Sequence, residues 1–336
     1  MPSSLDIAIV GATGLVGELL VELLEERHFP VGTLHLLGSG EAIGHALPFK
    51  GRNLRVRDLD AFDFAQVRLV FLAGEATRAA ALDARLTAAG CSVVDLSGGL
   101  DPATLTWVVA EANGERLVDL TPPLRIGNPC APAILLAAAL APLCPLLSLQ
   151  RVTVTACLAV SSRGQEGVGE LARQTAELLN ARPLEPRVFG GQMAFNLLGM
   201  VDTADGEGHG CLERRVHDEL RALLGLPGLE VAVTCIQVPV FFGDSLSVSV
   251  LTGEAPDLAQ VRARLADAEG LELAEGDDCP SVVGDAVGQD VIHVGRLRGG
   301  LHDPRELNLW IASDNVRKGA ALNAVRSAEL LIKHYL

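Results

Sequence analysis

The sequence lacks a Cys-x-x-Cys pair, a basic N-terminal segment and any long uninterrupted apolar run. Its seven cysteines are an odd number scattered through 336 residues, so we expect neither a disulfide framework nor a zinc site. Free cysteines are typical of the reducing cytoplasm, where we expect the protein to reside without a bound metal. Charges interrupt every apolar run before it reaches membrane-spanning length, so we expect neither membrane insertion nor secretion.

Positive charge is also scarce. The chain has 27 Lys and Arg residues against 42 Asp and Glu residues, which gives a net charge of -15. Nucleic acids and anionic membranes are bound by clustered Lys and Arg, so we expect neither as a partner, and small molecules or other proteins instead. Hydrophobic residues make up 49% of the chain, which is enough for globular cores, and its length indicates about two domains.

A glycine-rich turn near the N-terminus joins an apolar run to a segment with helical periodicity. The run Asp6–Val10 has the length of a buried strand, Gly11–Gly17 follows at once, and Glu18–Glu26 repeats apolar residues at helical spacing. Glycines let the backbone approach a pyrophosphate, which the helix N-terminus also attracts. This order predicts a dinucleotide-binding turn; the alternative is a tight turn that binds nothing. The candidate contacts are Gly11, Thr13, Gly14, Leu15, Val16 and Gly17.

The loop after the second predicted strand bears on the choice of cofactor. Strand Thr33–Leu37 is followed by a loop that contains Ser39 and Glu41. In dinucleotide-binding folds an acid here accepts a hydrogen bond from the ribose 2′-hydroxyl, whereas an arginine accommodates a 2′-phosphate. Because Glu41 would repel a 2′-phosphate, we expect NAD to be favoured over NADP. The alternatives are an exposed glutamate without a role and a vestigial pocket that binds no cofactor.

Strand-like and helical segments alternate through the first third of the chain. Strands are predicted at 69–73, 92–96 and 107–110, with a helix at 76–89. This alternation predicts a doubly wound parallel sheet of the Rossmann type. The amphipathic segment 315–333 is expected to return to this domain as a helix.

Beyond residue 149 the strand-like runs become longer. They lie at 151–160, 229–240 and 244–251, with helices between them, which predicts a mixed sheet in an α+β domain. The last run alternates polar and apolar residues, so one sheet face is left for solvent or a partner, and we expect a homodimer. The predicted domains are 1–128 with 314–336, which binds the dinucleotide, and 129–313.

A cysteine stands at the start of the apolar segment 133–140. Asn128-Pro129 interrupts the chain before it, and Pro132 suits the first turn of a helix. Cys130 is therefore expected at a helix N-terminus, where unpaired N–H groups and the helix dipole lower the pKa of a thiol. Cys130 is the candidate nucleophile, and the alternative is a buried cysteine that packs as a small hydrophobe.

Several short motifs occur in order along the chain. They are Gly11–Gly17, the Asn128-Pro129-Cys130 turn, Ala159–Gly164, Phe195-Asn196, Thr234–Val240, Val294–Arg298 and Leu309–Ala324. Together they resemble aspartate-semialdehyde dehydrogenase, and within that family the chain looks most similar to the Usg-type paralogues. The resemblance implies an NAD(P)-binding Rossmann domain, a central α+β dimerisation domain, and a chemistry in which a cysteine thiolate attacks an aldehyde or acyl phosphate.

The positions that carry the family's chemistry differ in this chain. If Pro129 anchors the family's Pro-Asn-Cys run, Cys130 takes the asparagine position and Ala131 takes that of the nucleophile. One position at a helix start turns a side chain by roughly 100°. The other changes replace a glutamine by Leu158, the substrate arginine by Gln237, the histidine base by Asp244, and two further arginines by Asp101 and Glu41.

Two residues keep a family correspondence. Asn315 matches the position near the nicotinamide, although Asp314-Asn315 also makes an ordinary helix cap. Arg215 corresponds to a lysine that binds substrate or phosphate, and the favoured alternative is a cation on the surface of a helix. The changed positions lead to the hypothesis of a dimeric ligand- or partner-binding paralogue without the family's catalysis. The alternative is an NAD-dependent oxidoreductase that acts on an aldehyde or acyl group with Cys130 as a shifted nucleophile.

Overall fold

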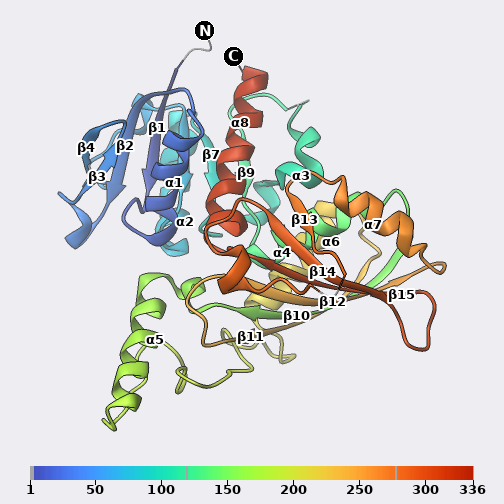
Figure 1. Ribbon diagram of the computed structural model, residues 1–336. Coiled ribbons are helices and arrows are strands. Elements are labelled where there is room, and N and C mark those ends of the chain that lie inside the picture. The colour runs from blue at the N-terminus through green and yellow to red at the C-terminus, as the bar shows by residue number, and fades with distance from the viewer. Residues whose placement is uncertain (1–3, 119, 277, 336) are drawn as a thin grey trace. The chain divides into compact units, whose positions relative to one another are not determined.

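A computed structural model describes residues 4–118, 120–276 and 278–335 (Figure 1). The chain divides into two compact units, Met1–Pro129 with Ala320–Leu336, and Cys130–Gly319. The sequence placed the corresponding boundaries at residues 128 and 314.

The first unit is built on a sheet of seven strands, all parallel, in the order β5-β2-β1-β6-β7-β9-β8. Successive strands are connected through helices or turns on either side of the sheet, as the alternating sequence pattern predicts. The doubly wound parallel fold is thereby confirmed. Its strands are β1 (Leu5–Val10), β2 (Val31–Gly38), β5 (Arg57–Asp58), β6 (Leu69–Leu72), β7 (Ser92–Asp95), β8 (Thr106–Trp107) and β9 (Arg125–Gly127).

Both faces of this sheet are buried. On one face Ile7 and Ile9 of β1 pack in a core with α1 (Leu15–Glu26) and α8 (Asn323–Tyr335). On the other face Ala8 and Val10 pack with α2 (Ala76–Ala89) and with aromatic side chains of the preceding turn. Burial on both faces explains why these strands are continuous apolar runs rather than alternating ones. The remaining short helix is α3 (Ala110–Asn113).

The sequence patterns missed or misplaced some elements of this unit. A separate hairpin of β3 (Ala46–Phe49) and β4 (Arg52–Arg55) was not predicted. Lys50 and Gly51 both have positive φ, at 47° and 72°, which is the geometry of a two-residue turn between antiparallel strands. The strand predicted at 107–110 is wrong beyond Trp107, because the chain turns there into α3.

The second unit is built on a mixed sheet of six strands in the order β11-β10-β12-β15-β14-β13. β10 pairs parallel with β11 and antiparallel with β12, which confirms the predicted mixed sheet. The strands are β10 (Leu149–Leu158), β11 (Glu230–Gln237), β12 (Asp244–Thr252), β13 (Leu271–Leu273), β14 (Ile292–Gly299) and β15 (Glu306–Ser313), and the helices are α4 (Ala131–Leu140), α5 (Gly164–Leu179), α6 (Cys211–Leu224) and α7 (Leu258–Ala266).

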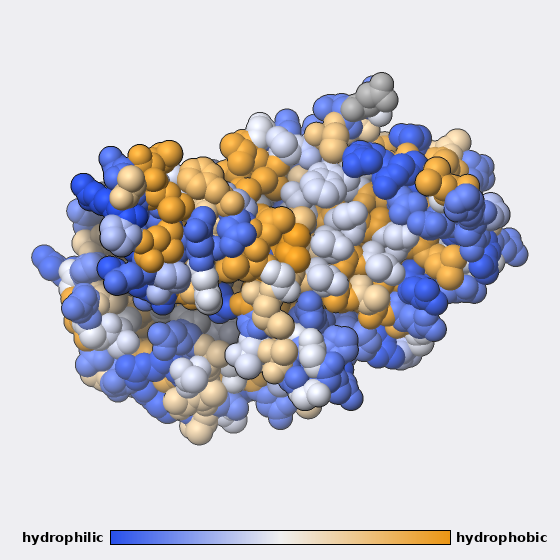
Figure 2. All heavy atoms as spheres, turned by 90° about the horizontal axis from the view of Figure 1, so that it is seen from below, coloured by the Kyte–Doolittle hydropathy of each residue, from blue (hydrophilic) through white to orange (hydrophobic). Residues whose placement is uncertain are grey.

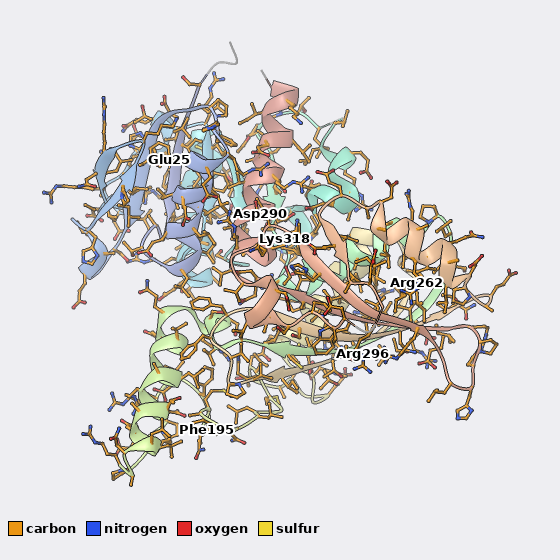
Figure 3. All side chains as sticks on the ribbon, in the orientation of Figure 1. Glu25, Phe195, Arg262, Asp290, Arg296 and Lys318 are labelled. Atoms are coloured by element: carbon orange, nitrogen blue, oxygen red, sulfur yellow. The ribbon has the colours of Figure 1, made fainter. Side chains whose placement is uncertain are left out.

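The two faces of this sheet differ in character. Val152, Val154 and Val248 are buried, whereas their neighbours Thr153 and Ser247 are exposed on the opposite face. Figure 2, which views the molecule from below, shows apolar residues scattered among polar ones on the surface. Large exposed apolar side chains of this unit include Leu179, Phe195, Leu197, Met200 and Phe241, and Figure 3 shows Phe195 in the segment after α5.

No helix among the described residues is long and apolar enough to cross a membrane.

Candidate functional site

The glycine turn of the first unit is shaped by contacts that only glycine permits. Gly11 has φ 80°, and a Cβ atom there would lie 2.6 Å from Gly74. A Cβ on Gly17 would lie 2.1 Å from the carbonyl oxygen of Gly11, so the first turn of α1 rests directly on the loop. Gly14 precedes α1, and a Cβ there would be 3.6 Å from its nearest neighbour, an ordinary contact. Gly11 and Gly17 therefore allow the close backbone packing of the turn, while the absence of a side chain at Gly14 leaves the N-terminus of α1 accessible to a ligand.

A cavity of about 380 Å³ opens at this turn, at the carboxyl ends of the strands. Parallel α/β sheets bind their ligands at this edge, so the turn fits the pyrophosphate of a dinucleotide. Of the predicted contacts, Gly11, Thr13, Gly14 and Ser39 line the cavity. The other lining residues are Val10, Gly38, Ala42, Leu59, Ala73, Gly74, Glu75 and Arg78.

Five other predicted contacts are not among the lining residues, and four of them belong to the first unit. Leu15, Val16 and Gly17 belong to α1, where Val16 packs against the core and Gly17 against the loop. Glu41 is exposed on a short 3-10 turn after β2. It is not among the residues of the described chain that line this cavity, whereas its neighbours Ser39 and Ala42 are.

Asn315, predicted near a nicotinamide, belongs to the second unit and is buried. Its side-chain oxygen accepts hydrogen bonds from the backbone N–H of Gly243, at 2.9 Å, and from the hydroxyl of Ser161, at 3.1 Å. These contacts tie β15 to the loops that follow β10 and precede β12. The described geometry gives Asn315 a structural role inside its own unit.

Cys130 lies directly before α4, as the sequence predicts, with Ala131 as the first helical residue and Pro132 in the first turn. Its backbone N–H donates to Oε2 of Glu219 on α6, at 2.7 Å. The other carboxylate oxygen of Glu219 accepts from Nε of Arg215, at 2.8 Å. Ala131 lies against Gly319, because a Cβ atom on Gly319 would be 2.8 Å from the Cβ atom of Ala131.

The electrostatics at Cys130 are opposite to those expected from the helix start. Burial raises the pKa of the Cys130 thiol well above its ordinary value, and the negative charge of Glu219 raises it further. Arg215 opposes this rise but does not cancel it. The predicted lowering by the helix N-terminus is therefore wrong, because desolvation and a neighbouring carboxylate both disfavour the thiolate more than the dipole favours it.

Asp244, which is predicted at the position of the family's histidine base, begins β12 and is 1% exposed. Its Oδ1 accepts the backbone N–H of Ala159 at 2.9 Å. Burial raises the pKa of Asp244 to about 7, and the charge of Asp314 adds to the rise. The assumption of an ordinary aspartate pKa is therefore wrong, since this value lies where a general base works best.

Gln237, which is predicted at the position of the substrate arginine, is also 1% exposed. Its Nε2 donates to the carbonyl oxygen of Leu158 at 2.7 Å, so the two changed positions contact one another across β10 and β11. A neutral amide cannot replace the charged, bidentate contact that an arginine makes with a carboxylate. Gln237 and Leu158 are thus the paired last residues of β11 and β10.

Some residues of this region gave little signal in the sequence. Glu219 is 89 positions from Cys130 along the chain. The sequence signal for its burial is that a charged residue falls on the apolar face of α6, beside Val216, Leu220 and Leu223. Lys318, labelled in Figure 3, is 2% exposed although its type is almost never fully buried. The described residues contain no group of three or more His, Cys, Asp or Glu placed to hold a metal ion.

Comparisons with known proteins agree with this architecture. Residues 6–120 match the semialdehyde dehydrogenase NAD-binding domain family, and residues 140–318 match the semialdehyde dehydrogenase dimerisation domain family. The chain is 59% identical to a USG-1 protein homolog of Azotobacter vinelandii, over 99% of both chains. It is 37% identical to aspartate-semialdehyde dehydrogenase 2 of Vibrio cholerae, over the full length of both.

A solved structure described as a probable aspartate-semialdehyde dehydrogenase from Pseudomonas aeruginosa superposes with a TM-score of 0.96. It is 55% identical and covers 99% of this chain and 100% of its own. With matched domains in the same order and relatives of this identity over the whole length, the chain belongs to the aspartate-semialdehyde dehydrogenase family.

Proposed function

We propose that this protein is a dinucleotide-binding member of its family that does not carry out the phosphorylating oxidation of aspartate semialdehyde. The observation that carries the proposal is the state of Cys130, whose thiol is buried and whose pKa is raised by burial and by Glu219. A nucleophilic cysteine must reach the substrate as a thiolate. The neutral Gln237, already bonded to Leu158, supports the same conclusion because it offers no charge to a substrate carboxylate.

The test is a direct assay of the purified protein with aspartate semialdehyde, phosphate and NAD or NADP, following the reduced nicotinamide by absorbance. The Vibrio cholerae relative, assayed under the same conditions, is the positive control. We expect no turnover above the rate without protein, alongside measurable dinucleotide binding by calorimetry. Turnover that is lost in Cys130→Ala would overturn the proposal.

A second candidate function rests on Asp244. Its pKa of about 7 suits a general base, and Cys130 stands at a helix start. Together they favour an oxidoreductase that acts on a less anionic aldehyde or acyl group. A panel of uncharged aldehydes with NAD and NADP tests this candidate, and activity that survives both Cys130→Ala and Asp244→Asn would exclude it.

We also propose that the protein is a homodimer formed through the second unit. The match of residues 140–318 to a dimerisation domain supports this, as does the sheet face on which Thr153 and Ser247 are exposed. Light scattering coupled to size-exclusion chromatography should give twice the chain mass of 35.2 kDa. A single-chain mass at micromolar concentration would contradict a stable dimer.

A further inference from the structure

We propose that a second cavity of the first unit binds a small monocarboxylate with a branched apolar body. The cavity has a volume of about 340 Å³ and lies at the amino ends of the parallel strands, where β1, β6 and β7 begin. Sites for small molecules are typically lined by apolar side chains with a few polar groups that orient the ligand. The lining residues are Leu5, Arg68, Leu69, Gly90, Ser92, Pro122, Pro123 and Leu331.

This cavity is separate from the one at the glycine turn. Leu5 begins β1 and lines the present cavity, whereas Val10 ends β1 and lines the other. At about 3.3 Å per residue, the two ends of this strand lie roughly 16 Å apart. A ligand bound at the amino ends of the strands therefore leaves the dinucleotide cavity free.

Arg68 supplies a positive charge. Its backbone is fixed between two strands, because its N–H donates to the carbonyl oxygen of Asp6 at 3.0 Å and its own carbonyl oxygen accepts from the N–H of Ser92 at 2.9 Å. The side chain is exposed, and no other described residue forms a hydrogen bond or ion pair with its guanidinium. The guanidinium can therefore bind a ligand carboxylate through two parallel hydrogen bonds.

Ser92 supplies a second hydrogen-bond donor. It is 5% exposed, and its Oγ accepts the backbone N–H of Leu124 at 3.0 Å. Within the described chain its hydroxyl hydrogen has no acceptor, so it can donate to a ligand. One cation and one neutral donor suit a singly charged carboxylate, whereas a phosphate would bring a second charge against apolar walls.

The described lining of this cavity contains no carboxylate, although the whole chain has 42 Asp and Glu residues against 27 Lys and Arg residues. Four other cavities of the described chain each include at least one carboxylate, namely Glu254, Glu213, Glu18 and Glu75 in turn. Local charge therefore favours an anion at the cavity that Arg68 lines.

The apolar part of the site determines the body of the ligand. Leu5, Leu69 and Leu331 line the cavity and belong to the core that contains β1 and α8. Pro122 and Pro123 also line it and are exposed, and their rings carry no N–H group that would need a partner. A branched aliphatic body between these leucines and prolines removes apolar surface from water, which acetate is too small to do.

The experiment measures binding of 4-methylpentanoate, 4-methylpentanamide and acetate to the full-length protein by ligand-detected NMR titration. The variants are Arg68→Gln, Arg68→Lys and, as a matched control, Arg52→Gln. Arg52 is an exposed arginine on β4 of the same unit and is not among the described residues that line the cavity. We expect 4-methylpentanoate to bind the unaltered chain with a Kd of about 1 mM, at least about tenfold more tightly than its amide or acetate.

Arg68→Gln should weaken 4-methylpentanoate by about tenfold and leave the amide unchanged. Arg68→Lys keeps the charge but loses the paired hydrogen bonds, so we expect a loss of about threefold, while Arg52→Gln changes nothing. A Kd above about 10 mM for 4-methylpentanoate would overturn the inference. So would equal binding of the acid and its amide, equal binding of acetate, or equal losses in Arg68→Gln and Arg52→Gln.

Discussion

The carboxylate of Glu219 accepts the backbone N–H of Cys130 at 2.7 Å, although the two residues are 89 positions apart. This contact fixes the start of α4 against α6 and places a negative charge beside the thiol. It also satisfies one of the N–H groups that a helix start leaves without a partner. The same carboxylate thus stabilises the helix start and disfavours the thiolate.

Replacing Glu219 should destabilise the fold. Glu219→Ala leaves a buried N–H group unpaired, so we expect the free energy of unfolding to fall by about 1–3 kcal/mol, measured by denaturant titration. Glu219→Gln keeps an acceptor and should cost less. Glu230→Ala is the control, because the Glu230–Arg151 pair is 69% and 54% exposed and should contribute almost nothing. Equal effects of the Glu219→Ala and Glu230→Ala changes would contradict this assignment.

Thiol-alkylating reagents should modify Cys130 more slowly than the exposed cysteines. Cys211 and Cys279 are exposed, whereas Cys130 is buried with a raised pKa. We expect iodoacetamide at neutral pH to modify the two exposed cysteines at least roughly ten times faster than Cys130, as read by peptide mass spectrometry. Preferential labelling of Cys130 would instead identify a reactive thiol and favour the second candidate function.

Asp244 should make stability depend on pH between about 4 and 7. Its pKa is about 7 in the folded protein and roughly 3.9 in the unfolded chain, so the native state binds more protons in this window. Stability from this group is therefore fully present below pH 4 and is lost as pH rises to 7. Asp244→Asn removes the charge and should gain about 4 kcal/mol over the unaltered chain at pH 8, but almost nothing at pH 4.

Unfolding titrations of both proteins at the two pH values provide this measurement. A difference between them that does not change with pH would show that Asp244 is already ionised in the folded protein at low pH.

The glycine turn offers a matched pair of substitutions. Gly17→Ala places a Cβ 2.1 Å from the carbonyl oxygen of Gly11, so we expect a loss of about 1–3 kcal/mol in stability. Gly14→Ala meets only an ordinary contact at 3.6 Å within the protein, and should fold normally while binding dinucleotide less tightly. Thermal unfolding and calorimetry separate the two effects. Normal binding by Gly14→Ala would place the pyrophosphate elsewhere.

The elements that the sequence predicts well are those whose pattern is local. Helix α2 was predicted at its observed bounds, and the strand–glycine–helix order of β1 and α1 follows from periodicity and turn chemistry alone. Strand β14 is one of the strands that the sequence patterns do not predict, and it has no such signal. It contains two glycines and a residue with positive φ, Arg296, and is held by pairing with β15, which lies later in the chain.

The candidate site divides in the same way. The sequence by itself determined the family, the glycine turn and the placement of Cys130 at a helix start, because each follows from residues adjacent along the chain. Only the tertiary structure decided that the pKa values of Cys130 and Asp244 are raised. It also decided that Ser161 and Gly243 donate hydrogen bonds to Asn315, and that Arg78 lines the cavity. Burial and the charge of distant neighbours govern those properties, and neither is encoded in local spacing.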